Sequence, residues 1–470
     1  MKDVVIDRIL KRKSTVILLF EFVLLLFALF TSLIFNQFNF LSEFIISIIV
    51  LTLLFLICKW LLEKYVYKED RRLLLFFTLL TSIIGFVIYF AVVYGREYTY
   101  ESDHVVYYNL QNELKTLFID SPLNGLLGIL FSCWQSDYSY FINLFLAAPF
   151  QFTDGSNEAF VMTYYLVLLV PVFFVNNIWL FDIIKRVNIK RKRTFIFLGN
   201  VTFLCFPLIH FASLLGMPDL FGMFFVISIV IMLSNFDFIK FDKTGAIILS
   251  LLFVCLAVTR RWYIFWMLGF VPVFLIITFL LSLYGRDTKK IKKTLFNEIK
   301  LIICACCFVV IMLAPFIYNT LFQRNYSEDY SEWYLGGFWF ELYNQLGYLG
   351  LLLSFLMLIG IIYGFVNKQL RPICFVSVIG YFVSIYFFTT IQNMGKHQSL
   401  LLVMYYLLFI YMFFCLICKL KSKIISLILV LLVILVIALN ILSTYYVWVD
   451  DLNGLFFTTK YAISKRFVWK

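Results

Sequence analysis

The sequence predicts an all-α membrane protein that crosses the bilayer many times. Hydrophobic residues make up 63% of the chain and charged residues only 14%, a composition that ordinary soluble domains do not have. Apolar runs of about 20 residues recur along the whole chain, and each is long enough to cross a bilayer core of roughly 30 Å. No polar stretch is long enough to form a separate soluble domain. We therefore predict a polytopic protein with about 13 transmembrane helices.

The predicted spans follow the apolar runs in order. They are residues 15–35, 41–60, 73–95, 159–184, 194–214, 219–235, 244–259, 261–283, 298–320, 345–366, 372–390, 399–419 and 423–447. The first run follows Lys11, Arg12 and Lys13 and has no small-residue cleavage site behind it. We interpret it as a retained signal anchor.

Basic residues predict the orientation of the chain. The net charge is +12, but the charge is spread over short loops between apolar runs, which is the positive-inside pattern and not the patch of a nucleic-acid-binding protein. These loops are residues 1–13, 64–72, 185–193, 286–293 and 419–423. We therefore predict a plasma-membrane protein with a cytoplasmic N-terminus and no nucleic-acid partner. The tail, residues 450–470, falls outside by the span count although it is basic, so it is the exception to the pattern.

The segment 96–158 forms the first large outer loop by this count. Its apolar pieces, 122–133 and 138–150, are short for a crossing, and counting the second as a span would move 185–193 outside. We predict that they lie as helices at the outer membrane interface. Residues 104–118 fit the same interpretation, because most of their apolar and polar residues separate onto two helical faces; Asn109 and Glu113 lie on the flank of the apolar face, so the amphipathicity is imperfect. The apolar face holds Val106, Leu110, Leu114 and Leu117, and the polar face holds Gln111, Asn112 and Lys115.

A second outer loop, residues 323–344, mixes acidic and aromatic side chains. It holds Glu328, Asp329, Glu332 and Glu341 among Tyr326, Tyr330, Trp333, Tyr334, Trp339 and Tyr343. Carboxylates bond sugar hydroxyls and aromatic rings stack on the apolar faces of pyranoses, so the loop suits sugar binding. An aromatic belt at the membrane interface explains the same composition, and both interpretations stay open.

The unusual charges also gather on the predicted outer side, where they suggest a site. Ionisable groups near membrane depth are costly and tend to serve function. Asp103 is the candidate general base, because a carboxylate beside a hydroxyl can take its proton; the alternatives are a metal ligand or a residue that ends a helix in water. Arg260 and Arg261 break the positive-inside trend, which suggests a phosphate bound through paired hydrogen bonds, unless they contact lipid headgroups.

Further residues complete this candidate site. For Lys396 and His397 we predict either a share in binding the phosphate or only the anchoring of a helix at the interface. We predict that Glu101 and Asp219 bind sugar hydroxyls or a divalent ion, and that His104 and Tyr330 are further substrate-binding residues. Two carboxylates and a histidine do not specify a metal site, so Mg²⁺ or Mn²⁺ stays an open alternative and no cofactor is assigned.

The order of these features resembles the GT-C superfamily of membrane glycosyltransferases, such as protein O-mannosyltransferases and lipid A aminoarabinose transferases. The resemblance is carried by Ser102-Asp103-His104, then Ser121-Pro122-Leu123, then the apolar stretch Tyr138–Phe150. It covers about residues 73–400 as an arrangement of elements rather than as matched sequence. Here the acidic residue follows the third predicted span instead of the first, and the Asp-Glu pair of O-mannosyltransferases is Asp-His.

The resemblance implies a GT-C-like fold and an inverting hexosyl or N-acetylhexosaminyl transferase. Its donor would be a polyprenyl-phosphate-linked sugar, and its acceptor a cell-envelope glycopolymer or glycolipid, with the active site at the outer face. Residues 1–72 would supply two added helices, 73–320 the catalytic module with outer loop 96–158, and 321–470 outer loop 321–344 with the last spans. The abundance of Lys, Ile, Phe and Tyr hints at an AT-rich bacterial genome, and hence at cell-wall polysaccharide synthesis.

Two other functions remain as alternatives. A flippase or transporter of lipid-linked oligosaccharides would need ionisable residues at the bilayer midplane and repeats between its halves, and the sequence has little of either. A polysaccharide polymerase or ligase is also polytopic with charged outer loops. The absence of one dominant outer loop argues against it.

Overall fold

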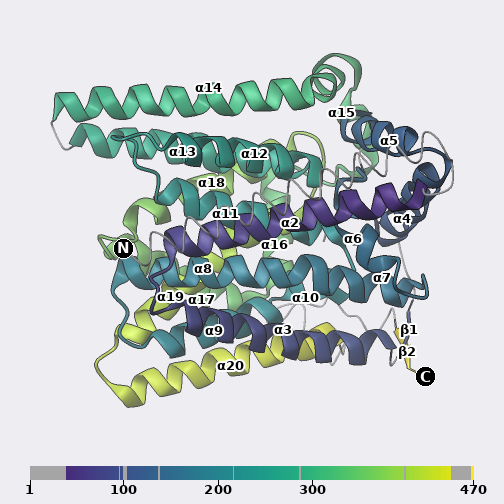
Figure 1. Cartoon of the computed structure of the whole chain (residues 1–470). Coiled ribbons are helices and arrows are strands. Elements are labelled where there is room, and N and C mark those ends of the chain that lie inside the picture. The colour runs from purple at the N-terminus through teal and green to yellow at the C-terminus, as the bar shows by residue number, and fades with distance from the viewer. Residues whose placement is uncertain are drawn as a thin grey trace, which may run out of the picture.

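The chain folds into a bundle of roughly parallel and antiparallel helices with one short two-stranded pairing (Figure 1). The computed structural model describes residues 39–94, 96–98, 103–135, 138–214, 216–284, 287–395, 398–445 and 467–469. The predicted all-α class is therefore confirmed for these residues. The predicted span 15–35 lies outside them.

Eight helical segments in the described part of the chain are long and apolar enough to cross a membrane. They are formed by α2 (Asn39–Tyr65), α3 (Arg71–Tyr94), α7 with η1 and α8 (Asn157–Tyr164, Tyr165–Leu169, Val170–Val187), α13 (Tyr263–Tyr284), α14 (Thr288–Tyr318), α18 (Arg371–Thr389), η5 with α19 (Gln398–Leu402, Val403–Lys419) and α20 (Lys423–Tyr445). A ninth is added if α16 (Phe338–Leu349) and α17 (Leu351–Val366) count as one broken span. These are the long apolar helices of a multi-pass membrane protein.

Shorter elements connect the long helices. They are β1 (Arg96–Tyr98), α4 (Asp103–Asp120), α5 (Pro122–Gln135), α6 (Phe141–Phe150), α9 (Lys192–Cys205), α10 (Pro207–Leu214), η2 (Pro218–Phe221), α11 (Gly222–Ser234), α12 (Lys243–Thr259), η3 (Asn319–Gln323), α15 (Tyr326–Asp329), η4 (Ser331–Trp333) and β2 (Phe467–Trp469). β1 pairs antiparallel with β2, which brings the end of the chain beside the start of the 96–158 segment.

The predicted count of about 13 spans is not confirmed, because several predicted spans are short or broken. The run 194–214 is two helices that meet at Phe206–Pro207, where proline forces the preceding residue into an extended conformation. The runs 219–235 and 244–259 form apolar helices of fewer than 18 residues. The run 345–366 bends by 107° between α16 and α17. Gly350 sits at that bend with φ +76°, a conformation that glycine adopts without a steric penalty.

The three helices predicted at the outer interface exist, but their interfacial position is not confirmed. α6 is buried at eight of its ten residues and packs against α2, α4 and α7. α4 buries Asp103, His104, Tyr107, Gln111, Leu114 and Phe118. Gln111, which we predicted on the polar face, accepts a hydrogen bond from Asn143 on α6 at 3.1 Å. The buried face of α4 therefore includes a residue that we predicted on its polar face.

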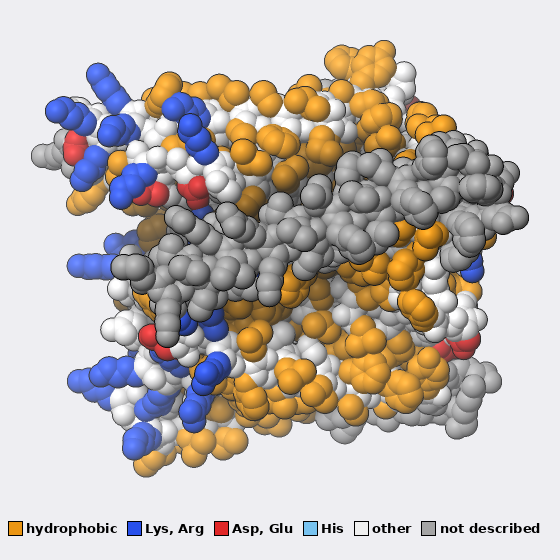
Figure 2. All heavy atoms as spheres, in the orientation of Figure 1, with side chains coloured by type: hydrophobic (Ala, Val, Ile, Leu, Met, Phe, Trp, Pro, Cys, Tyr) orange, Lys and Arg blue, Asp and Glu red, His pale blue; other side chains and the backbone are white. Residues whose placement is uncertain are grey.

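The basic loops lie together at one end of the bundle, as the charge pattern predicts. Lys64 pairs with Asp242, and Lys192 with Asp70 at 2.9 Å, so contacts join loops that are far apart in sequence. Figure 2 shows Lys and Arg side chains gathered at this end, where α14 and α20 begin, while hydrophobic side chains cover the flanks. The opposite end carries α4, α5, α15 and the β1–β2 pair (Figure 1).

The antiparallel pair of α13 and α18 brings two distant segments to this opposite end. The two helices pack closely at Gly269 and Gly380, since a Cβ added at Gly269 would lie 2.7 Å from the Gly380 carbonyl oxygen. Small residues at a crossing let helix backbones approach closely. The start of α13 and the end of α18 therefore lie together, and the rings of Trp262 and Phe388 are 5.3 Å apart.

Candidate functional site

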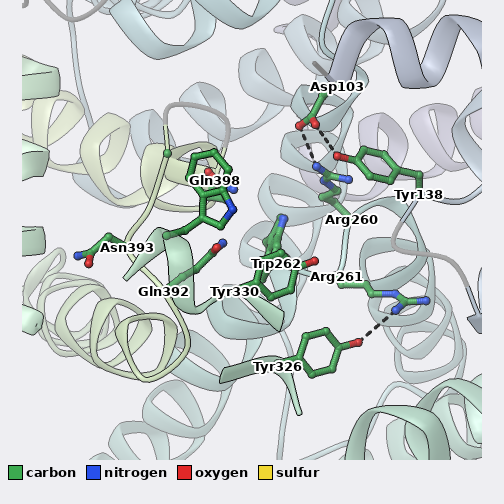
Figure 3. Close-up of a pocket in the computed structure, with 12 residues that line it drawn as sticks. Asp103, Tyr138, Arg260, Arg261, Trp262, Tyr326, Tyr330, Gln392, Asn393 and Gln398 are labelled. Atoms are coloured by element: carbon green, nitrogen blue, oxygen red, sulfur yellow. Dashed lines mark hydrogen bonds and ion pairs between the residues drawn. The ribbon is translucent and has the colours of Figure 1, made fainter. Parts of the chain in front are cut away.

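A cavity of about 240 Å³ (Figure 3) lies at the end of the bundle that carries the start of α4 and α15, opposite the basic loops (Figure 1). Five parts of the chain form it: the start of α4, the loop before α6, the turn between α12 and α13, the segment around α15 and η4, and the loop between α18 and η5. Its lining residues are Asp103, Tyr138, Arg260, Arg261, Trp262, Tyr326, Tyr330, Trp333, Gln392, Asn393, Gly395 and Gln398.

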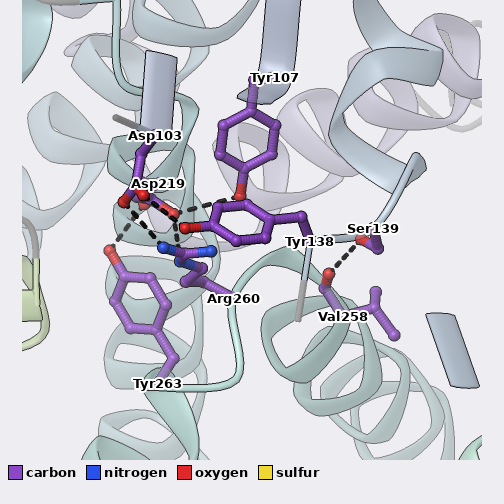
Figure 4. A network of polar contacts seen from close by, with 8 residues as sticks. All are labelled: Asp103, Tyr107, Tyr138, Ser139, Asp219, Val258, Arg260 and Tyr263. Carbon is purple, nitrogen blue, oxygen red and sulfur yellow. Dashed lines mark hydrogen bonds and ion pairs between the residues drawn. The ribbon is translucent and has the colours of Figure 1, made fainter. Parts of the chain in front are cut away.

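Two carboxylates share one guanidinium beside the cavity. Arg260 donates from Nη2 to Oδ2 of Asp103 at 2.8 Å, and its Nε lies 2.9 Å from Oδ1 of Asp219 (Figure 4). All three side chains are buried, with at most 5% of each residue exposed. Buried charges of this kind persist only when they are paired and hydrogen-bonded. We call Asp103, Asp219 and Arg260 the carboxylate–arginine cluster.

Three tyrosines complete this cluster and distinguish its two carboxylates. The Tyr138 hydroxyl donates to Oδ1 of Asp103 at 2.5 Å, and the Arg260 guanidinium lies 4.1 Å from the centre of the Tyr138 ring. Tyr107 donates to Oδ1 of Asp219 at 3.2 Å, and Tyr263 to its backbone oxygen at 2.9 Å. Asp219 is thereby enclosed, whereas Asp103 lines the cavity.

Tyr138 keeps its proton at neutral pH. Burial raises the pKa of Tyr138 to about 12, and the negative charge of Asp103 contributes in the same direction. The phenol therefore donates its hydrogen bond to the Asp103 carboxylate. This bond and the one from Arg260 hold Asp103 in a single orientation toward the cavity.

Arg261 lies apart from the carboxylate–arginine cluster on the same side of the cavity (Figure 3). Its Nη1 donates to the Tyr326 hydroxyl at 3.2 Å, and its guanidinium lies 4.4 Å from the centre of the Phe316 ring. A guanidinium held against aromatic rings presents its flat fork of donors to an anion. The structure thus gives the adjacent arginines different surroundings.

Aromatic rings form the middle of the cavity. The rings of Trp262 and Tyr330 meet edge to face at 5.3 Å, and Tyr326 stacks parallel to Tyr330 at 6.1 Å. Trp333 follows in η4. These aromatic residues come from the predicted outer loop 323–344 and from the α12–α13 turn.

Gln392, Asn393 and Gln398 line the side of the cavity opposite the charged residues, and we call them the amide wall; the carboxamide of Asn393 points away from the cavity (Figure 3). Asn393 accepts hydrogen bonds from the backbone nitrogens of Leu335 and Gly336, both at 2.8 Å, so it is fixed to the aromatic segment. Gln392 is 2% exposed, and its buried Nε2 has no hydrogen-bond partner among the described residues. The buried Oε1 of Gln398 likewise has none there.

The structure brings five of the predicted site residues together. Asp103, Arg260, Arg261 and Tyr330 line the cavity, and Asp219 reaches it through Arg260. His104 does not line it, because its Nε2 faces Oδ1 of Asn157 at 3.4 Å and its ring lies edge-on to Phe160. The remaining predicted site residues, Glu101, Lys396 and His397, lie outside the described residues.

Sequence reasoning assigned no role to Tyr138 or to the amide wall. Tyr138 stands in the sequence as the first residue of an apolar stretch, and nothing in the pattern indicates a contact to Asp103, 35 positions away. The sequence does contain one indication for Gln392 and Asn393. They are a polar pair in the same predicted outer loop as Lys396 and His397.

The described residues contain no group of three or more His, Cys, Asp or Glu side chains placed to hold a metal ion. No known protein family, curated protein or solved structure matches the chain. The function is therefore argued from the chemistry of the cavity.

Proposed function

We propose that this protein is an inverting membrane glycosyltransferase. It would move a hexosyl or N-acetylhexosaminyl group from a polyprenyl-phosphate carrier to a hydroxyl of a cell-envelope glycopolymer or lipid-linked acceptor, at the outer face of a bacterial plasma membrane. One observation carries the proposal: a single cavity combines a buried, oriented carboxylate, an arginine outside the carboxylate–arginine cluster, and a wall of aromatic and amide side chains. The carboxylate can act as a general base, the arginine can bind a phosphate, and the aromatic and amide side chains can bind a sugar ring.

In the proposed reaction Asp103 removes the proton from the acceptor hydroxyl. The acceptor oxygen forms a bond to the anomeric carbon, while the bond from that carbon to the phosphate oxygen breaks on the opposite face. The electron pair of the broken bond leaves with the polyprenyl phosphate, and the proton stays on Asp103 until solvent removes it. The anomeric configuration is inverted, since attack and departure take place on opposite faces.

The two arginines have different tasks in this proposal. Arg260 is already shared by Asp103 and Asp219, so it orients the base. Arg261 is the arginine assigned to the phosphate, because it lines the cavity, whereas the guanidinium shared by Asp103 and Asp219 is that of Arg260. This assignment narrows the expectation from the sequence, in which both arginines bound the phosphate.

Replacing Arg261 by alanine is expected to raise KM for the lipid-phosphate donor by about tenfold or more, because a charge-assisted hydrogen bond to phosphate is lost. Lysine should restore binding only in part, since it lacks the two-pronged donor fork. Initial rates over a range of donor concentrations measure both effects. Arg72→Ala is the control, as Arg72 is an exposed arginine at the start of α3, at the opposite end of the bundle. An unchanged KM in Arg261→Ala would remove the phosphate role.

The outward position of the cavity is tested by labelling of single introduced cysteines. Glu332 is exposed beside the cavity-lining Trp333, and Glu69 is exposed in a basic loop at the other end. In intact cells, a membrane-impermeant thiol reagent should label Glu332→Cys above the parent level, and should reach Glu69→Cys only after permeabilisation. If Glu69→Cys is labelled in intact cells and Glu332→Cys only after permeabilisation, the cavity faces the cytoplasm and transfer at the outer face is refuted.

A further inference from the structure

We infer that α16 lies in the plane of the membrane at the cavity end of the bundle, and that its aromatic face enters the lipid leaflet there. This position does not depend on the proposed reaction. In the sequence, residues 338–349 fall partly in the predicted outer loop 323–344 and partly in the predicted span 345–366, so the helix was not predicted as a unit. For the aromatic residues of α16 the structure favours the membrane-interface interpretation.

The two faces of α16 are reversed relative to those of a helix on the surface of a soluble protein. Its polar face is buried, since Glu341, Asn344 and Gln345 all point inward. Its exposed face is apolar and carries side chains at helical spacing, namely Trp339, Phe340, Tyr343 and Leu346, with Trp339 79% and Tyr343 76% exposed. Large apolar side chains seldom gather on a face that water covers, so this face indicates another surrounding.

The composition of the exposed face fits the boundary between lipid and water. Trp and Tyr concentrate at the headgroup level of membranes, where the ring lies in an apolar layer and the polar atom reaches water. Trp333, just before α16, is also exposed and lines the cavity. The cavity therefore borders the segment that carries this aromatic face.

α17 leads from α16 to the basic end of the bundle. It runs beside α19 in the same direction, because Gly360 and Gly364 face Phe409 and Met412 of α19 in turn. α19 ends at Lys419, where the basic loop 419–423 begins. α17 therefore starts at the level of α16 and ends near the headgroups on the basic side.

The length of α17 places α16 within the lipid layer. α17 has 16 residues, which is about 24 Å at the helical rise of 1.5 Å per residue. A bilayer core is roughly 30 Å thick, so α17 stops about 6 Å short of the opposite edge of the core. At that depth the chain bends by 107° at Gly350, and α16 continues across the bundle instead of out into water.

Contacts with α18 indicate the same depth. The ring of Phe338 lies 6.3 Å from that of Phe382 and 6.5 Å from that of Tyr386. These two residues stand seven and three positions before the end of α18 at Thr389, or about 5–10 Å along the helix. Interfacial helices bury their apolar face about 5–10 Å into the headgroup and acyl boundary. Phe382 and Tyr386 are themselves exposed on a spanning helix, so the aromatic face of α16 continues a surface that faces lipid.

The buried face of α16 connects this membrane contact to the cavity. Glu341 accepts a hydrogen bond from Asn393 of the amide wall at 2.9 Å. One helix thus contacts lipid on one side and a wall of the cavity on the other. The cavity is therefore held near the level of the lipid headgroups.

The test measures the depth of position 343 in the full-length protein in phospholipid nanodiscs. A fluorescent amino acid replaces Tyr343 by stop-codon suppression, which leaves the native cysteines in place. The lipids carry a nitroxide quencher either near the headgroup or near the end of the acyl chain. We expect quenching by the headgroup-side nitroxide to be at least about twofold stronger, because an interfacial helix lies only about 5–10 Å into the boundary. The same label at Leu358, exposed midway along α17, and at Glu69, exposed in a basic loop, gives the deep and the aqueous reference.

Quenching at position 343 that is no stronger than at position 69 would overturn the inference. Native mass spectrometry of the same sample then separates the other occupants of the face. A dimer would mean that a second copy covers it, and a monomer would mean that water or another segment of the chain does. Quenching that is strongest with the deep nitroxide would also overturn it, because α16 would then lie in the acyl core.

A pair of charges on the aromatic face provides the second measurement. Trp339→Glu combined with Tyr343→Glu, with the label at Leu346, should lower quenching by the headgroup-side nitroxide by about twofold, because carboxylates at membrane depth are costly. Gln323→Glu combined with Ser327→Glu is the matched control, since it adds the same charge to exposed polar positions. If the first pair leaves the quenching at position 346 at the parental value, the aromatic face does not hold α16 in the lipid.

Discussion

Asp103→Asn is expected to lower the rate of sugar transfer by about 10²–10⁴-fold, the usual effect of losing a general base. Asparagine keeps the size of the side chain and one acceptor oxygen, but it cannot take the acceptor proton. The fold should tolerate the change, because Arg260 keeps its second partner, Asp219, at 2.9 Å and is not left as an unpaired buried charge. Single-turnover transfer, together with donor binding on the same protein, measures the two effects separately.

Asp219→Asn is the matched control for Asp103→Asn. Both substitutions remove one carboxylate from the same guanidinium, but only Asp103 lines the cavity. If the effect of Asp103→Asn came only from weakening the ion pair, the two variants would lose similar amounts of activity. The base role requires a much larger loss in Asp103→Asn while donor binding persists. Equal losses, or a parental rate in Asp103→Asn, would eliminate it.

The fold was predictable where a single local property decides it. Apolar runs such as 73–95 and 372–390 correspond to α3 and α18, since length and hydropathy alone identify a spanning helix. The loops around Lys64 and Lys192 share one end of the bundle, as their charge predicted. The predicted span 345–366 is broken by a 107° bend at Gly350, which hydrophobic periodicity does not detect. A glycine in an apolar run looks the same whether it bends the chain or packs against a neighbour, as Gly269 does.

The charged residues of the site were predictable in part, because a charge beside an apolar run is also a local property of the sequence. Asp103, Asp219 and Arg260 are rare charges beside apolar runs, and the cost of burying them requires partners. Their pairing with one another depends on which helix ends meet, and that is a tertiary property. From the sequence we predicted that both arginines bind phosphate, because the residues around Arg260 in the sequence do not show that Asp103 and Asp219 share its guanidinium.

For the aromatic and amide residues of the site, the sequence predicted only an aromatic loop and not the individual residues that line the cavity. The aromatic loop 323–344 suggested either sugar binding or a membrane belt. In the structure Tyr326, Tyr330 and Trp333 line the cavity, although Trp333 is also 64% exposed, whereas Trp339 and Tyr343 are exposed and do not line it. Asparagine and glutamine carry no charge to mark them, so Gln392 became a candidate only when its burial was known.

Glu341 is the residue that holds the neutral side of the cavity in place. It is fully buried on α16, and it accepts hydrogen bonds from Gln345 at 2.7 Å, from Asn393 at 2.9 Å and from the Met394 backbone at 2.9 Å. Asn393 in turn fixes the backbone of Leu335 and Gly336. One carboxylate thus joins α16, the amide wall and the aromatic segment. A carboxylate that accepts several N–H groups makes bonds stronger than those between neutral groups.

Glu341→Ala is expected to destabilise the protein by about 3 kcal/mol or more, because each buried donor left without a partner costs about 1–3 kcal/mol. The donors of Asn393 and Gln345 would lose their acceptor, so KM for the lipid-phosphate sugar donor should rise together with the loss of thermal stability. Glu341→Gln should recover only part of both, since it turns one acceptor oxygen into a donor that faces other donors. Thermal unfolding followed by tryptophan fluorescence, and KM on the same preparations, provide the measurements. Glu332→Ala is the control, being an exposed acid in the same loop. If Glu341→Ala unfolds at the parental temperature with the parental KM, the carboxylate does not hold the amide wall in place, and the rigidity of that wall must come from the helices alone.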